Sequence, residues 1–97
     1  MVFGLQIHVV NDQSEAPICD AVVTARSRAY SERLVPSVSY DAGCYYFGAS
    51  ERAGTYSLRA EAAGFLPSTL ADVTVRGGEC HVETVRRSIR LVPTEER

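Results

Sequence analysis

Short runs of alternating apolar and polar residues are the feature that most limits how this chain can fold. The first run places one set of side chains on one face of a strand: Phe3, Leu5, Ile7 and Val9. The residues between them fall on the other face: Gly4, Gln6 and His8. A period of two is typical of a half-buried strand, and no window of about eleven residues has the period of a helix. The sequence therefore predicts an all-β fold.

Further alternating runs follow, separated by clusters of turn-forming residues such as NDQSEAP at 11–17. The second run places small side chains inward: Ala21, Val23 and Ala25. Because they are small, we expect a bulky side chain to pack across from them. In the middle of the chain Tyr45 and Phe47 alternate with Cys44 and Tyr46, and the inward alternation continues through a second set: Tyr56, Leu58, Ala60 and Ala62.

Three segments have a less regular pattern. The region from Tyr30 to Tyr40 is interpreted as one irregular edge strand, because Pro36 lacks a backbone N–H for the ladder. The RGG segment at 76–78 is interpreted as a hairpin turn rather than as an RNA-binding repeat, since it occurs once and beside an acid. In the last run, from about 81 to 92, Arg87 falls on the inward side, which predicts a bulge or a frayed strand start nearby.

The count of about seven short strands, with turn signals every ten residues or so, predicts an antiparallel β-sandwich around one core. We expect residues 1–97 to form a single domain, with 93–97 as a flexible tail. The residues predicted to be buried are Leu5, Ile7, Val23, Tyr56, Leu58, Val73, Val75, Ile89 and Leu91.

Composition excludes several classes of function. The net charge is −2, and the ten basic residues, all of them arginine, are interspersed with twelve acids, so no basic face for nucleic acid is expected. No apolar run approaches the roughly 18 residues of a transmembrane helix. The first residues do not form a signal peptide, because Gln6 and His8 interrupt the apolar stretch. The expected location is cytoplasmic if Met1 is the native start, and the cell envelope or secreted if a leader was removed.

The motifs APICDAVVTA, DAGCYYF, RAGTYSLRAEAAGF, DVTV and SIRLVP occur in an order that resembles the carboxypeptidase regulatory-like domain. That family is a seven-stranded β-sandwich of the transthyretin-like (prealbumin-like) and immunoglobulin-like kind. The residues that carry the resemblance are Pro17, Ile18, Ala21, Gly43, Tyr45, Phe47, Gly54, Thr55, Tyr56, Gly64 and Phe65. The chain departs from the family pattern at Glu15 and Ala16, where a glycine is usual, and at Ala53, where proline is common.

The resemblance implies a non-catalytic accessory or interaction module, without catalytic residues, cofactor or metal. Its expected partner is an unidentified protein or a cell-surface polymer, and its oligomeric state is left open. A fold of this kind serves unrelated neighbours, so it does not by itself set an activity.

A second resemblance favours an enzyme. The segments IHVVND and APICDAVV are similar to the start of the transthyretin-related hydroxyisourate hydrolases, which activate water with histidines and an arginine. His8 and His81 would be the corresponding histidines. That family ends in Tyr-Arg-Gly-Ser, whereas this chain ends in LVPTEER. We therefore expect His8 to be a solvent-facing strand residue and His81 to be a polar residue at a turn.

The three cysteines allow two further interpretations. Cys19, Cys44 and Cys80 have with His81 the ligand types of a zinc site, but not the spacing of compact structural sites. If successive strands alternate in direction, Cys19 and Cys44 lie at one end of the sandwich and Cys80 at the other. A strand some 17 Å long separates the two ends, beyond the roughly 7 Å that a disulfide allows between Cα atoms.

Cys19 with Cys44 is therefore the preferred pair if a bridge forms. A bridge between Cys44 and Cys80 is the alternative, since both lie beside turns. Reduced thiols are the default for a chain without a leader.

Overall fold

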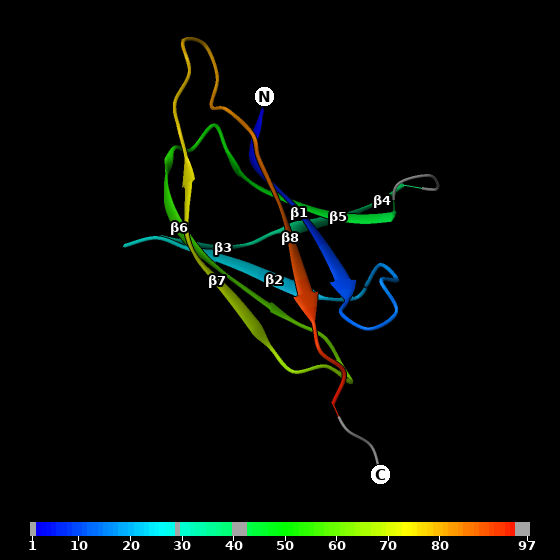
Figure 1. The fold of residues 1–97 in the computed structure, drawn as a ribbon. Coiled ribbons are helices and arrows are strands. Elements are labelled where there is room, and N and C mark those ends of the chain that lie inside the picture. The colour runs from blue at the N-terminus through cyan, green and yellow to red at the C-terminus, as the bar shows by residue number, and fades with distance from the viewer. Residues whose placement is uncertain (1, 29, 40–42, 95–97) are drawn as a thin grey trace.

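The computed structural model describes residues 2–28, 30–39 and 43–94, and these residues form eight strands in two sheets (Figure 1). The first sheet has the strand order β4 (Val35–Ser39), β5 (Gly43–Ser50), β1 (Phe3–Asn11) and β8 (Val85–Leu91). The second has the order β3 (Ser31–Arg33), β2 (Val22–Arg26), β6 (Gly54–Glu61) and β7 (Ser68–Val75). None of the described residues forms a helix with the length and apolarity needed to cross a membrane.

The predicted all-β sandwich is confirmed, with one parallel strand pair in an otherwise antiparallel arrangement. β1 pairs antiparallel with β5 and parallel with β8. After β7 the chain crosses from the second sheet back to the first through residues 76–84 and enters β8 parallel to β1. Figure 1 shows this long connection at the same end of the sandwich as the N-terminus. Within it, the amide of Gly78 donates to the carbonyl of His81 (2.8 Å), so the chain turns at 78–81 and not at 76–78, and β7 and β8 do not form the predicted hairpin.

The core lies between the two sheets. Every side chain predicted to be buried is at most 3% exposed. Ala21, Val23 and Ala25 are buried, as predicted, and the bulky side chain of Tyr46 of β5, which is fully buried, lies next to Ala21. Its hydroxyl accepts a hydrogen bond from the amide of Ala21 (3.0 Å). Cys44 and Tyr46 therefore face inward, and Tyr45 and Phe47 lie on the outer face of the first sheet.

The prediction of one irregular strand between residues 30 and 40 is corrected to two strands, which accounts for eight strands instead of seven. Leu34 separates them: its side chain is buried and its amide donates to the carbonyl of Val23 (2.8 Å). The chain therefore leaves the second sheet as β3 and enters the first as β4. Both are edge strands, as expected from Pro36. Tyr40 lies outside the described residues.

The predicted position of Phe3 on the same face as Leu5 is wrong. Gly4 and Leu5 are both buried, so the alternation shifts between them, and Phe3 packs against Phe47 of the outer face with ring centroids 5.2 Å apart. Glycine is required at position 4, because a Cβ there would lie 2.7 Å from Cγ1 of Val75. The close approach of the two sheets at Gly4 thus explains why the simple period of two fails.

Of the bulge or strand start expected near Arg87, the structure has the strand start, at Val85, and a bulge lies in β7. β8 pairs with β1 without a register shift, from Leu5 with Val85 to Asn11 with Leu91. In β7, Ala71 and Asp72 both oppose a single residue of β6, and Asp72 has a left-handed φ of 59°. Arg87 is exposed on the inward side of β8, where its side chain lines a hollow beside β7.

The ordered chain extends past the expected start of the tail. Pro93 forms a β-bridge with Phe65, and the amide of Thr94 donates to the carbonyl of Gly64 (2.9 Å). Residues 95–97 of the predicted tail lie outside the described residues.

Candidate functional site

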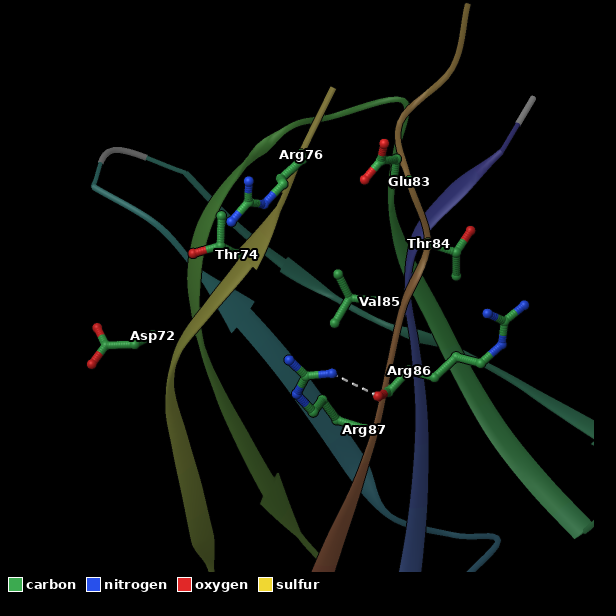
Figure 2. Close-up of a pocket in the computed structure, with 8 residues that line it drawn as sticks. All are labelled: Asp72, Thr74, Arg76, Glu83, Thr84, Val85, Arg86 and Arg87. Carbon is green, nitrogen blue, oxygen red and sulfur yellow. Dashed lines mark hydrogen bonds between the residues drawn. The ribbon is translucent and has the colours of Figure 1, made fainter. Parts of the chain in front are cut away.

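The most distinctive polar feature of the surface is a groove between β7 and β8, which we call the β7–β8 groove. β7 is an edge strand of the second sheet and β8 is an edge strand of the first. The two strands are not paired with each other. The groove has a volume of about 380 Å³. Its lining is shown in Figure 2 and consists of Asp72, Thr74, Arg76, Glu83, Thr84, Val85, Arg86 and Arg87.

The charged groups of the groove, three arginines and two acids, are not neutralised in pairs. The ion pairs found among the described residues all involve other groups, so each of these five charges is available to a ligand. The one hydrogen bond drawn within the groove is donated by Nη1 of Arg87 to the carbonyl of Arg86 (2.9 Å; Figure 2). The groove therefore offers charged and hydrogen-bonding groups rather than an apolar cavity.

Arg86 and Arg87 lie on opposite sides of β8, as neighbouring residues of a strand do. Figure 2 shows their side chains extending in opposite directions from the strand. On the outer side, a second hollow of about 370 Å³ includes Arg86 together with Gln6, His8, Tyr45, Arg87 and Ser88. Hollows with arginine therefore lie along both sides of the edge formed by β8.

Aromatic side chains form a row on the outer face of the first sheet, over β5 and β1. The ring centroid of Tyr45 lies 6.5 Å from that of Phe47 and 4.9 Å from that of His8, on which it stacks. Phe3 continues the row beyond Phe47. This row gives Tyr45 and Phe47 a structural role: their rings pack against the rings of His8 and Phe3 on β1.

His8 lies on the outer face, as expected, but it is not a freely solvated side chain. Its ring is partly buried against Tyr45, and its Nε2 atom is buried without a hydrogen-bond partner among the described residues. The prediction of a solvent-facing residue is therefore corrected: the ring stacks on Tyr45 and its Nε2 atom is buried.

His81 is exposed at the turn, as predicted, and is held by Glu51. Nδ1 of His81 donates to the Glu51 carboxylate (2.8 Å), which also accepts from the amide of Val2 (2.7 Å). The bond from His81 is the main reason why the pKa of Glu51 is lowered. His8 lies six residues along the chain from Val2, about 20 Å at the rise of a strand. The structure thus does not bring the two histidines together.

The cysteines are arranged as the direction of the strands requires. Cys19 and Cys44 are bonded to each other through their sulfur atoms, with their Cα atoms 5.2 Å apart. Cys80 is exposed in the connection between β7 and β8, at the other end of β1. In the part of the chain that the structure describes, no group of three or more His, Cys, Asp or Glu side chains could hold a metal ion. Formation of the bridge in the protein stays a prediction.

Sequence reasoning did not identify the β7–β8 groove. The only signal was Arg87 on the inward side of the last strand, which was interpreted as a local irregularity. An arginine at a core position of an otherwise regular edge strand can also indicate that the two sheets are open there. The position of Asp72 in the bulge had no signal in the pattern.

Comparison with known proteins identifies the fold family. The family description "Carboxypeptidase regulatory-like domain" matches residues 5–91, which cover all the strands from within β1 to the end of β8. The chain therefore belongs to this family, as its motifs indicated. A search of curated proteins finds no match.

Proposed function

We propose that this carboxypeptidase regulatory-like domain is a non-catalytic interaction module that binds a protein or a cell-surface polymer. The observation that carries the proposal is the β7–β8 groove, where two sheet edges leave charged side chains without ion-pair partners. A structural ion pair would satisfy such groups within the domain, whereas a binding surface leaves them for a partner. Membership of a family of non-catalytic domains supports the same function.

The arrangement of titratable groups gives no comparable support for catalysis. The Glu51–His81 pair resembles an oriented base, but both side chains are well exposed and neither lines the β7–β8 groove. General acid–base chemistry requires the base within hydrogen-bond reach of a bound substrate. His8, the other candidate, has its Nε2 atom buried beneath its neighbours.

A turnover assay distinguishes the module from a hydrolase of the hydroxyisourate type. With hydroxyisourate as substrate, the purified chain is expected to leave the rate of hydrolysis at its uncatalysed value. Turnover by the wild-type chain that disappears in His8→Ala or His81→Ala would establish the enzyme and overturn the proposal.

A binding selection tests the module directly. A displayed library of random peptides and an array of polysaccharides are each probed with the full chain, and we expect ligands from at least one of them. These ligands should bind more weakly to a double variant, Arg86→Gln with Arg87→Gln. The matched control is Arg33→Gln, which removes an exposed arginine from the edge strand β3. Ligands that bind the double variant and the control equally, or no ligands at all, would contradict the proposal.

A further inference from the structure

We propose that the free edge of β8 binds an extended, acidic segment of a partner protein, which adds to the first sheet as a further strand. This inference rests on the function proposed above and names the chemistry of the partner. Strand addition uses the unpaired backbone groups of an edge for affinity and its side chains for selection.

The four sheet edges of the described structure differ in how they are protected against strand addition. β3 has only three residues, and β4 contains Pro36, which has no N–H to donate. β7 is interrupted by the bulge at Asp72, whose left-handed φ bends the strand. Short length, proline and bulges are three devices by which natural sheets block their edges, and charged side chains are a fourth.

β8 lacks the first three of these devices and is protected only by the charges of Arg86, Arg87 and Arg90. It runs for seven residues, contains neither proline nor glycine, and keeps a constant register with β1 from Val85 to Leu91. Since β1 occupies one side of it, the backbone groups directed to the other side have no strand partner. An added strand would lie at the β7–β8 groove, which provides space beside this edge.

The side chains of β8 select for negative charge. Arg86 and Arg87 take no part in the ion pairs of the described residues, and no acid lies within the strand. Arg90 is different, because Asp12 (2.8 Å) and Glu15 (2.6 Å) already hold its guanidinium. Side chains of an added strand also alternate between the two faces, so two successive acidic residues would present one carboxylate to each free arginine.

A second copy of this chain is a poor occupant of the same edge. In an antiparallel pair of β8 strands, the registers that place Arg86 opposite Arg86 or Arg87 opposite Arg87 bring free arginines together, and no register brings an acid of β8 opposite them. Like charges directly opposite each other destabilise a strand pair. The charge of the edge therefore favours an acidic partner over self-association.

The test uses blocked, fluorescently labelled peptides and the full chain. The probe has the sequence Val-Thr-Val-Asp-Glu-Val-Thr-Val, and the matched control peptide replaces its two acids with Asn-Gln. By fluorescence anisotropy we expect the acidic peptide to bind at least about tenfold more tightly than the control, as loss of a charge-assisted hydrogen bond predicts. The double variant Arg86→Gln with Arg87→Gln should abolish this preference, and Arg33→Gln should retain it.

Two further measurements separate strand addition from simple charge attraction. Amide hydrogen exchange should slow in β8 on binding and stay unchanged in β3 and β4. N-methylation of alternate peptide residues should block binding in one of the two possible patterns and not in the other, because only one side of the peptide pairs with the edge. Equal binding of both patterns, or no preference for the acidic peptide, would overturn the inference.

These outcomes also distinguish the inference from the proposed function. If the libraries yield ligands that depend on Arg86 and Arg87 but the acidic peptide does not bind, strand addition is wrong and the module function stands. Dimers that slow exchange in β8 would show that a second copy occupies the edge instead, which also overturns the inference.

Discussion

The hydroxyl of Tyr46 donates a hydrogen bond of 2.8 Å to the carbonyl oxygen of Ile18. The same hydroxyl accepts from the amide of Ala21, so the ring ties β5 to the segment that leads into β2. Burial raises the pKa of Tyr46, since the neutral hydroxyl is favoured over the phenolate there. Cys19 and Cys44, whose Cα atoms lie 5.2 Å apart, belong to the same two segments. The hydrogen bonds of Tyr46 thus hold this end of the sandwich together, and the predicted disulfide would add a covalent link there.

Tyr46→Phe is expected to lower the free energy of unfolding by about 1 to 3 kcal/mol, because the buried amide of Ala21 and the carbonyl of Ile18 lose their partner. Chemical denaturation measures the change. Tyr45→Phe is the matched control, since Tyr45 lies on the outer face and should change stability much less. Equal effects of the two substitutions would show that the buried tie contributes little.

The bridge between Cys19 and Cys44 is predicted to leave one free thiol, that of Cys80, when protein kept without reductant is unfolded and titrated. Three free thiols would mean that no bridge forms, and a Cys44–Cys80 peptide in a digest would contradict the strand directions. The two cysteines are 25 residues apart. Closing a loop of that length contributes about 3.5 kcal/mol in the chain-entropy model. Replacing both with serine should therefore lower stability by a similar amount relative to the oxidised protein.

The sequence and the structure agree where a residue's position is set by alternation alone. The small inward residues Ala21, Val23 and Ala25 predicted a bulky neighbour, and the buried Tyr46 lies next to Ala21. The prediction and the structure differ where the position of a side chain depends on how the two sheets pack against each other. Phe3 changes face because Gly4 allows a close approach to Val75, which a pattern within one strand cannot show.

The candidate site also depends on contacts between strands that are not visible in the pattern of a single strand. Arg86 and Arg87 are adjacent in sequence, but their exposure beside β7 follows from the order of strands in two sheets. That order depends on contacts between segments far apart in the chain. The proximity of Cys19 and Cys44 could be predicted, because it depends on strand direction. Strand direction, unlike strand order, can be inferred by counting the reversals along the sequence.

Leu58→Ala is expected to lower the free energy of unfolding by about 2 to 5 kcal/mol, since a fully buried leucine leaves a cavity in a close-packed core. This would be a large part of the stability of so small a domain. Thermal and chemical denaturation test it. A loss well below about 1 kcal/mol would indicate that the core collapses around the missing side chain or that Leu58 is not central to it.

The Glu51–His81 pair predicts a dependence of stability on pH. The bond from His81 lowers the pKa of Glu51 below its ordinary value of 4.5, so the folded state favours the carboxylate more than the unfolded state does. The resulting stabilisation is fully present above pH 4.5 and is lost as the pH falls through the lowered pKa. Denaturation of the wild type and of Glu51→Gln should therefore give curves that converge as the pH falls below 4.5.

His81→Ala is the control for this pair. We expect it to fold normally, because His81 is exposed, and to raise the pKa of Glu51 towards its ordinary value. Titration of the Glu51 carboxyl by NMR measures the change directly. An unchanged pKa of Glu51 in His81→Ala would show that the backbone amides of Val2 and Val82, rather than the imidazole, lower it.

His8→Phe is expected to stabilise the domain. Nε2 of His8 is buried without a hydrogen-bond partner among the described residues, and an unsatisfied buried polar atom costs about 1 to 3 kcal/mol. Phenylalanine removes that atom and keeps a ring to stack on Tyr45, whose centroid lies 4.9 Å away. The free energy of unfolding should therefore rise, by about 1 kcal/mol after allowance for altered packing.

His8→Ala removes the ring as well as the unsatisfied atom, so it should gain less than His8→Phe or lose stability. A lower stability of His8→Phe than of the wild type, measured by chemical denaturation, would show that Nε2 has a partner in solution, such as a bound water, which phenylalanine cannot replace.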